Sequence, residues 1–519
     1  MAEINHLIIH GGPIVTIDKS TIENGAVVVR DGRITEVVND LAAIADRPGE
    51  RYDLAGRTLV PGFIDAHNHL SVAALHPVFG DATDVRTEAD LVALVQTHAA
   101  EQPEAEYLRL HSWDDTKCDF ALDRHLLDRI DNLADHPIVV AHSSLHQCVA
   151  NSAALDRIGV AMRTPDPPGG EISRDTQGAP TGLLQETAWS EAHRRSLIAY
   201  ADPDRWEMLI AQRARALIRT GITSVHDAAC APDAEARYMA MADSGDLPIS
   251  VVAMPHSAAL LRNDLLERLD GPVTGDGDAK VRVGAVKLFA DGGIAIALDV
   301  TMNGNPIRHG HLMDDLQACA RRAVDRGYRI AVHAVGNRGV DHALDTFADL
   351  ARAHPGRDHR FRLEHAGVTG PDQWRRTADL DAIGVVQPGF VEHFGISSSG
   401  VTFDDHHWLA FAGLAAAGVR LAGSSDDPCA PVAPLWCIDK GVFRTTSTGL
   451  TLEANQSVAF ESWLRAYTLD AAYAGGQEDE RGSITGGKVA DFVEIANLDE
   501  CTTRSVAATW IGGQRVFVA

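Results

Sequence analysis

Lysine is scarce in this chain, and arginine supplies most of its basic charge. Acidic residues outnumber basic ones, which gives a formal net charge of −26 at pH 7. Because so acidic a surface repels phosphate backbones and anionic headgroups, we expect neither nucleic acid nor a membrane as a partner. Only six lysines occur among the 519 residues: Lys19, Lys117, Lys280, Lys287, Lys440 and Lys488.

The chain also has few cysteines and no long apolar segment. Its seven cysteines are scattered and form no C-x-x-C pair, so we expect no disulfide framework and a reducing, cytoplasmic location. No apolar run approaches the roughly 20 residues of a membrane span. The first residues lack a basic segment followed by an apolar one, so we expect no signal peptide. We find no internal repeat and no low-complexity segment.

Several apolar runs of this sequence end in residues that bind metals. The first covers residues 60–70 and ends in His67-Asn68-His69. Side chains at i and i+2 of a strand point to the same face, so one metal ion would be within reach of both imidazoles. With 24 histidines in the chain, one such pair is weak evidence by itself.

Four later runs strengthen this interpretation. They carry Lys287, His333, His365 and the pair Asp426-Asp427, each near the carboxyl end of a strand-like segment. Catalytic groups of a (β/α)8 barrel lie at the carboxyl ends of its strands. The pattern therefore predicts a TIM-like α/β barrel with a metal centre at that end.

Eight strand-like runs, most of them separated by helix-like stretches, favour a parallel barrel. A chain of 519 residues is long enough for such a barrel and one or two smaller modules. The expected strands are residues 63–69, 222–227, 249–255, 284–290, 329–335, 361–366, 382–388 and 419–425.

Two further domains are predicted. Short strands with turns at both ends of the chain suggest one β-sandwich built from residues 1–58 and 476–519. The interval between the first and second barrel strands far exceeds a βα connection, so we assign residues 76–203 to an inserted domain over the mouth of the active site. Residues 59–75 and 204–475 remain for the barrel.

Each candidate ligand also has a purely structural interpretation. Lys287 would serve as an ion-paired residue at a strand end, and a buried lysine is costly unless it is paired or neutral. A single histidine such as His333 is more often a core residue than a ligand. Asp426 would fit a helix cap or an Asx turn before Pro428. The ordered combination of these residues argues for the metal site.

The sequence resembles the amidohydrolase superfamily, in particular the amidohydrolase family 3 branch that includes N-substituted formamide deformylases. The resemblance covers nearly the whole chain, with two small departures: Asn337 stands where the family often has Asp, and Gly339 where it often has Ala. The matching motifs are residues 61–69, 287–292, 333–339, 364–365 and 425–428, with further matches at 146–152, 182–186 and 487–491.

The resemblance implies a metal centre with one or two divalent ions, zinc by default. It implies that His67 and His69 bind the more buried ion and that His333 and His365 bind the second. Lys287, carboxylated by CO2 to a carbamate, would bridge the two. Asp426 would contact a metal and carry the proton from the metal-activated hydroxide to the leaving nitrogen.

The predicted function is metal-dependent hydrolysis of a C–N bond in an amide, N-acyl or cyclic amide small molecule. An ester or lactone hydrolase stays open, because the same site would catalyse that reaction. Deaminases share this barrel but typically have Glu three residues after the histidine of the fifth strand, where this chain has Gly336. A non-catalytic binding barrel is the remaining alternative, and the complete ligand set argues against it. We expect a homo-oligomer, a dimer.

Four residues are weaker candidates for contact with the substrate: Trp113, His146, Gln387 and Phe390. Trp113 and His146 belong to the predicted insert, whereas Gln387 and Phe390 follow the predicted seventh barrel strand. Trp113 would fit equally well into the hydrophobic core of the insert, since aromatic side chains dominate cores. His146 would serve equally well as a local cap.

Overall fold

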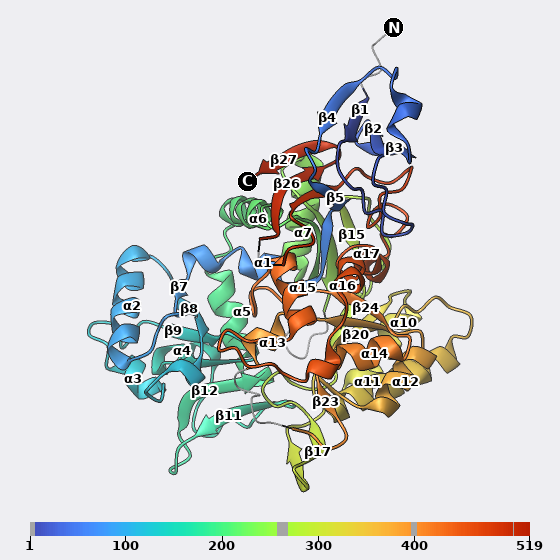
Figure 1. The fold of residues 1–519 in the computed structure, drawn as a ribbon. Coiled ribbons are helices and arrows are strands. Elements are labelled where there is room, and N and C mark those ends of the chain that lie inside the picture. Colours follow the sequence, from blue (N-terminus) through green and yellow to red (C-terminus); the bar gives the residue numbers. More distant parts are fainter. Residues whose placement is uncertain (1–5, 257–267, 396–401, 502) are drawn as a thin grey trace.

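A parallel barrel forms the centre of the protein (Figure 1). The computed structural model describes residues 6–256, 268–395, 402–501 and 503–519. The expected eight strands are present as β6 (Phe63–Asn68), β13 (Ile222–Cys230), β14 (Ser250–Pro255), β16 (Val286–Phe289), β19 (Ile330–Ala334), β20 (Arg362–His365), β22 (Ile383–Val386) and β24 (Arg420–Gly423).

Two arcs of strands close this barrel. β6, β13 and β14 pair in parallel in one arc, and β16, β19, β20, β22 and β24 pair in parallel in the other. A parallel bridge between His256 and Lys287 joins the arcs on one side. On the other side the Asp426 N–H donates to the His67 carbonyl at 2.8 Å. The TIM-like barrel is therefore confirmed, and its closure places residues from both ends of the barrel segment side by side.

Strand β16 differs slightly from expectation. The predicted strand 284–290 is instead β16, preceded by a short strand β15 (Val281–Val283) that pairs in parallel with β14. Gly284 and Ala285 separate the two strands. A Cβ on Gly284 would lie 2.7 Å from the side chains of Val252 and Met254, so the chain bends here only because position 284 has no side chain.

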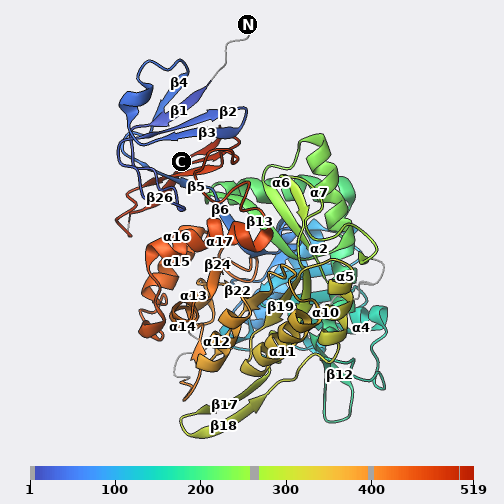
Figure 2. The same cartoon turned by 90° about the vertical axis from the view of Figure 1, so that its right-hand side faces the viewer.

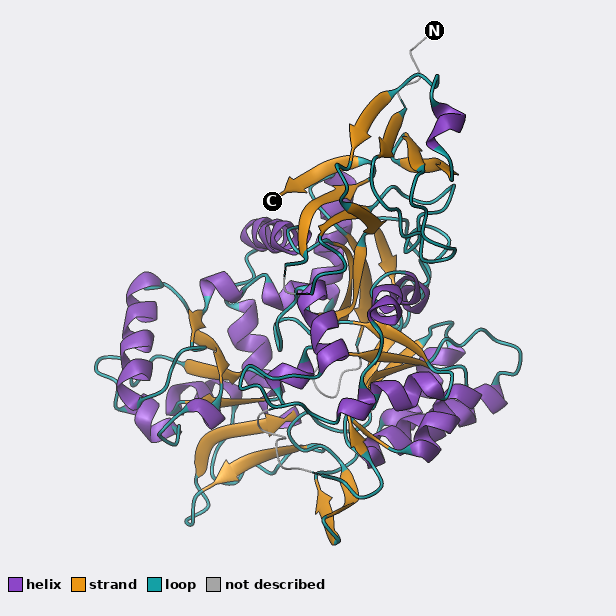
Figure 3. Ribbon diagram, in the orientation of Figure 1, coloured by secondary structure: helices purple, strands orange, loops and turns teal. Residues whose placement is uncertain are grey.

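Helices surround the barrel strands (Figure 3). α11 shows why: its buried residues Val340, Leu344 and Phe347 recur at helical spacing and pack into the main hydrophobic core. The surrounding helices include α1 (Leu70–Ala73), α6 (Pro203–Ile218), α7 (Pro232–Ser244), α10 (Leu316–Asp325), α11 (Asn337–Ala353), α12 (Pro371–Asp379), α13 (Phe390–His393), α14 (Phe411–Ala416), α15 (Pro434–Phe443), α16 (Phe460–Ala466) and α17 (Leu469–Gly475).

Both ends of the chain contribute to a pair of four-stranded sheets, which lies away from the 76–203 segment (Figures 1 and 2). Val27 and Ile9 from one sheet share a hydrophobic cluster with Phe492 and Trp510 from the other. The sheets have the orders β3-β2-β1-β4 and β27-β26-β25-β5, built from β1 (Leu7–His10), β2 (Ala26–Arg30), β3 (Arg33–Val38), β4 (Glu50–Asp53), β5 (Thr58–Pro61), β25 (Phe492–Ala496), β26 (Ser505–Ile511) and β27 (Gln514–Val518).

The long segment after β6 has a sheet of its own, ordered β11-β12-β10-β9-β8-β7, and its own hydrophobic clusters. The proposed domain limits at residues 58, 75, 203 and 475 stay a prediction. The elements are β7 (Gly80–Asp81), β8 (Leu108–Trp113), β9 (Ile138–His142), β10 (Gln147–Ala150), β11 (Gly170–Arg174) and β12 (Pro180–Glu186), with α2 (Glu88–Glu101), α3 (Arg124–Asp128), α4 (Ser152–Ile158) and α5 (Ser190–Ile198).

Small elements complete the loops at the barrel mouth: the hairpin β17 (Leu298–Met302) and β18 (Asn305–His309), and the pair β21 (Val368–Thr369) and β23 (His407–Trp408). Within the described part of the chain, no helix is long and apolar enough to cross a membrane.

Candidate metal centre

The six predicted ligands meet in one small cavity at the carboxyl ends of the barrel strands. The cavity has a volume of about 70 Å³. Lys287 Nζ lies 3.1 Å from His67 Nε2, and Asp426 Oδ1 lies 3.0 Å from His69 Nε2 and 3.3 Å from His67 Nε2. The residues that line the cavity include His67, His69, Lys287, His333, His365 and Asp426.

The two remaining histidines complete the group. The ring centroid of His365 lies 4.8 Å from that of His67 and 4.6 Å from that of His333. His365 and Asp426 have φ angles of 73° and 61°, in the left-handed region that costs free energy for residues other than glycine. Such strain is typical of functional sites, where the surrounding fold holds a side chain in place.

Each imidazole has one nitrogen held by a neighbouring acceptor, which leaves the other nitrogen for the cavity. His67 Nδ1 lies 2.6 Å from Glu364 Oε2, His69 Nδ1 lies 2.7 Å from the Ala228 carbonyl, and His365 Nδ1 lies 2.9 Å from Gln387 Oε1. His333 is held in the opposite sense, with Nε2 3.3 Å from the Gly292 carbonyl. Metal-binding histidines are typically oriented by such partners.

Burial keeps most of these imidazoles neutral, so that the nitrogen facing the cavity carries no proton. Desolvation, with the nearby Lys287 ammonium, lowers the pKa of His67 well below its usual value, and desolvation lowers the pKa of His365 to about 4. His69 is different: burial opposes its charge, but the hydrogen bond to Asp426 raises its pKa. Burial lowers the pKa of Lys287 to about 8. Neutral imidazole, neutral amine and carboxylate are the forms that bind a divalent metal or react with CO2.

Asp426 and its neighbour Asp427 have different partners. Burial alone would raise the pKa of Asp426, but the imidazoles of His67 and His69 hold it below its usual value. Asp427 instead forms a two-point ion pair with the guanidinium of Arg213 on α6. The structure thus places Asp426 at the cavity and uses Asp427 to anchor the loop.

Glu364 and Arg362 are parts of the site to which our sequence analysis gave no role. Glu364 accepts from His67 and from Arg362 Nε at 2.7 Å, and all three side chains are almost fully buried. Arg362 also donates to the Ala66 carbonyl, next to His67, at 2.6 Å. The spacing Arg-x-Glu-His within one strand was a visible signal, because it puts Arg362 and Glu364 on the same face of β20.

Replacing Glu364 by glutamine should weaken the metal centre while leaving its volume unchanged. We expect metal affinity to fall by about 10- to 100-fold, as for other residues that orient a metal-bound histidine. Competition with a chelator measures this affinity. Glu494→Gln is the matched control, because Glu494 is a buried carboxylate paired with Arg57 in the terminal sheets. Equal affinities for the two variants would contradict the assigned role.

The long insert reaches the cavity through His146. The His146 ring centroid lies 5.2 Å from that of His333, and His146 Nδ1 lies 2.7 Å from Glu186 Oε2. The other oxygen of Glu186 accepts the N–H groups of Ile294 and Ala295, which follow β16. Glu186 itself adopts φ 50° and ψ −126°. Glu186 therefore has a strained backbone and a buried carboxylate, and this carboxylate joins the 76–203 segment to a barrel loop and orients His146.

Gly292 makes this contact feasible. A Cβ on Gly292 would lie 2.3 Å from Glu186 Oε1, so Gly292→Ala should push the carboxylate away and disturb His146. We expect a loss of about 1–3 kcal/mol of stability, the usual cost of overpacking, together with reduced activity. Thermal unfolding and turnover check this. Gly486→Ala is the control, since its nearest neighbour is 3.6 Å away, and an equal melting temperature would contradict the prediction.

The four residues predicted to contact the substrate have different surroundings in the structure. His146 lines the cavity. Phe390 stacks on His365 at a centroid distance of 6.2 Å, and Gln387 is fully buried between His365 and Ser424. Trp113 packs in a hydrophobic cluster of the insert and does not line the described cavity. Contact of these residues with a substrate stays a prediction.

The amidohydrolase family model matches residues 50–517. This chain belongs to the amidohydrolase family. The amidohydrolase is 31% identical over 516 residues to an N-substituted formamide deformylase of Arthrobacter pascens, covering 95% of this chain and 94% of that protein. It is also 29% identical to the putative amidohydrolase YtcJ of Bacillus subtilis, over 98% of both chains.

A solved structure shows the same fold. An uncharacterized metal-dependent hydrolase from Pyrococcus horikoshii superimposes with a TM-score of 0.74 at 20% identity, covering 98% of this chain and 100% of that one. Membership of the amidohydrolase family makes this chain a hydrolase that acts on carbon–nitrogen bonds. Among the described residues, His67, His69 and Asp426 lie close enough together to hold a metal ion.

Proposed function

We propose that this amidohydrolase removes a small acyl group, a formyl group above all, from the nitrogen of a small-molecule amide. The observation that carries the proposal is that contacts of 3.3 Å or less link Lys287 to His67, His67 to Asp426 and Asp426 to His69 in one chain. The similarity to a formamide deformylase over nearly the whole chain supports the same reaction class.

The residues fit a metal centre, by the chemistry of their donor atoms. Imidazole nitrogens and carboxylate oxygens are suitable ligands for zinc. We propose zinc, with His67, His69 and Asp426 around one ion and His333 and His365 at a second position. A carbamate on Lys287 would bridge these positions. When bound, the metal would lower the pKa of a coordinated water and polarise the scissile carbonyl.

Asp426 is the proposed proton carrier. Its pKa is held below the usual value, so it is ionised and ready to accept a proton from the attacking water. The proton then passes to the amide nitrogen as the C–N bond breaks, which yields a carboxylate and an amine. Among the described residues it is the carboxylate in contact with both His67 and His69.

The deaminase alternative needs a glutamate three residues after His333. That position is Gly336, where even a Cβ would lie 2.2 Å from the carbonyl oxygen of Ala297. No longer side chain fits there without movement of the loop. This lack of space favours hydrolysis of an amide over deamination, and ester or lactone hydrolysis stays as the second candidate.

Carboxylation of Lys287 should depend on pH in a defined direction. CO2 reacts with the neutral amine, and burial lowers the pKa of Lys287 to about 8. Below that pH most Lys287 is protonated and unreactive, so raising pH from about 6 to about 8 should increase the reactive fraction roughly fifty-fold. We expect metal-free protein, mixed with zinc at fixed dissolved CO2, to regain activity faster at the higher pH. A pH-independent rate would contradict a carbamate.

The proposed reaction is tested with zinc-loaded protein and matched compounds: N-methylformamide, methyl formate, a γ-lactone and adenosine. We expect formate and methylamine from the first compound, at a rate above that of the other three. Preference for methyl formate or the lactone would favour an esterase, and release of ammonia from adenosine would favour a deaminase. Metal content, measured by mass spectrometry on protein purified without chelator, should be about two ions per chain.

A further inference from the structure

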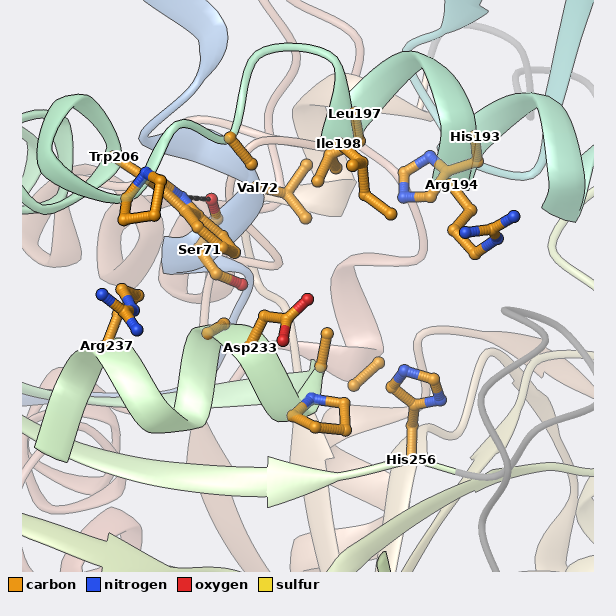
Figure 4. A pocket seen from close by; sticks show the side chains of 16 residues that line it. Ser71, Val72, His193, Arg194, Leu197, Ile198, Trp206, Asp233, Arg237 and His256 are labelled. Atoms are coloured by element: carbon orange, nitrogen blue, oxygen red, sulfur yellow. Dashed lines mark hydrogen bonds between the residues drawn. The ribbon is translucent and has the colours of Figure 1, made fainter. Parts of the chain in front are cut away.

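A second cavity, of about 480 Å³, lies between the insert and the barrel (Figure 4). Its walls come from α1, α5, α6, the end of β13 and the start of α7. Most of the lining is aliphatic or aromatic, with Leu197, Ile198 and Trp206 on one wall and Pro232 and Ala234 on another. Ile198 is 50% exposed, so the cavity reaches the protein surface.

This cavity adjoins the metal centre. Val72, His193 and Ala229 line both the larger cavity and the one that contains the candidate ligands. The two volumes are very unequal, at about 480 and 70 Å³. A cavity of roughly 150 Å³ holds one benzene ring, so a ring fits the larger space and not the smaller.

His193 provides a polar group at this junction. The guanidinium of Arg109, which is fully buried, donates to His193 Nδ1 at 3.2 Å and to Ser196 Oγ at 2.7 Å. Because a guanidinium only donates, the proton of the neutral imidazole must lie on Nε2. In Figure 4 the His193 ring points toward the cavity. His193 therefore offers one N–H donor to a substrate that spans the two spaces.

The charges around the larger cavity disfavour an anionic ligand. Arg194 pairs with Glu191 at 2.8 Å, and Arg237 pairs with Glu207 at 3.1 Å. The Asp233 carboxylate points into the cavity in Figure 4 and forms no ion pair with another described residue. Among the described acidic and arginine side chains that line this largely apolar space, the Asp233 carboxylate is therefore the one without an ion-pair partner in the described part of the chain.

We propose that this second cavity is the subsite for the nitrogen substituent of the substrate. The substrate class is then a secondary formamide whose substituent is uncharged, apolar and large enough to contain an aromatic ring. The inference rests on the proposed function, because it places the scissile amide at the metal centre. It makes helix α5 of the insert a determinant of specificity, together with the barrel residues Trp206 and Pro232.

Two isomeric amides test the orientation. N-(2-phenylethyl)formamide and 3-phenylpropanamide have the same atoms but place the aromatic ring on opposite sides of the amide. We expect kcat/KM to be at least about tenfold higher for the formamide, the discrimination that an apolar pocket achieves. N-Formylphenylalanine adds a carboxylate to the same substituent and should be the poorer substrate. Preference for either competitor over the phenylethyl formamide would overturn the assignment.

Ile198→Trp tests whether the nitrogen substituent occupies the second cavity. The added bulk should lower kcat/KM for N-(2-phenylethyl)formamide about tenfold more than for N-methylformamide, because only the former needs the second cavity. Met208→Trp on α6 is the matched control, since Met208 is 60% exposed and does not line the cavity. If both variants changed the ratio of the two kcat/KM values equally, the second cavity would not be the site of the nitrogen substituent.

A binding measurement separates this inference from the proposed reaction. Calorimetric titration of N-(2-phenylethyl)formamide into the protein, with and without Ile198→Trp, reads occupancy of the cavity even if no compound is hydrolysed. Binding that Ile198→Trp weakens, without any turnover, would support the subsite and contradict the deformylase reaction. Turnover of N-methylformamide with no binding preference for the aromatic compound would support the reaction and overturn the subsite.

Discussion

Replacement of Lys287 by alanine should remove one metal ion per chain and almost all activity. Lys287 is buried and lies 3.1 Å from His67 Nε2. Its loss would remove the proposed carbamate bridge between the two groups of histidines. A Lewis-acid metal contributes several kcal/mol to catalysis, so kcat should fall by about three orders of magnitude. Metal analysis and steady-state kinetics on the same preparation measure both effects.

The control for this variant is Lys280→Ala. Lys280 is also partly buried, but its ammonium donates to the Pro248 carbonyl rather than to a candidate ligand. We expect it to retain the metal content of the unmodified protein. Because a carbamate offers carboxylate-type oxygens, added acetate should restore part of the metal content of Lys287→Ala. An unchanged metal content in Lys287→Ala would assign Lys287 a structural role and favour a single-metal enzyme.

Replacement of Asp426 by asparagine should abolish turnover while the metal is retained. Asparagine keeps the shape of Asp426 and its contact with His69, but it cannot accept a proton. Loss of a general acid–base group costs about 10²- to 10⁴-fold in kcat. Substrate binding should change little. Normal activity in this variant would rule out the proton-carrier role.

Asp427→Asn distinguishes the catalytic carboxylate from its neighbour. It breaks the partly buried ion pair with Arg213, so we expect a lower melting temperature. The kinetic effect should be much smaller than that of Asp426→Asn, because the Asp427 side chain pairs with Arg213. The contact of Asp427 with a candidate ligand runs through its backbone carbonyl, which accepts from the His69 N–H at 2.8 Å and is kept in Asp427→Asn. A larger loss of kcat in Asp427→Asn than in Asp426→Asn would exchange the two assignments.

Strand β6 could be predicted from the sequence, whereas the contacts of Arg362 on β20 could not. The short apolar run before His67 and His69 is enough to predict a buried strand, and the i, i+2 spacing puts both imidazoles on one face. The structure agrees, with ring centroids 5.3 Å apart. The role of Arg362 could not be predicted in this way, because its partners include the carbonyl of Ala66, nearly 300 positions away along the chain.

The second cavity could not be derived from the sequence at all. Leu197 and Trp206 look like ordinary core residues in their own helices, and helical periodicity assigns them only to an inward face. They form a cavity because α5, α6 and α7 pack around a space that none of these helices fills. The role of His193 was equally hidden in the sequence, because its tautomer depends on a hydrogen bond from Arg109 on strand β8.

The sequence by itself determined the barrel, the order of its strands and the positions of the six candidate ligands. It did so because strand periodicity and ligand placement at strand ends are local patterns, repeated along the chain. The tertiary structure alone decided which nitrogen of each histidine faces the metal-site cavity, how Glu186 joins the 76–203 segment to the barrel, and where the second cavity lies. Those features depend on contacts between segments far apart in the chain, which form only when the barrel closes.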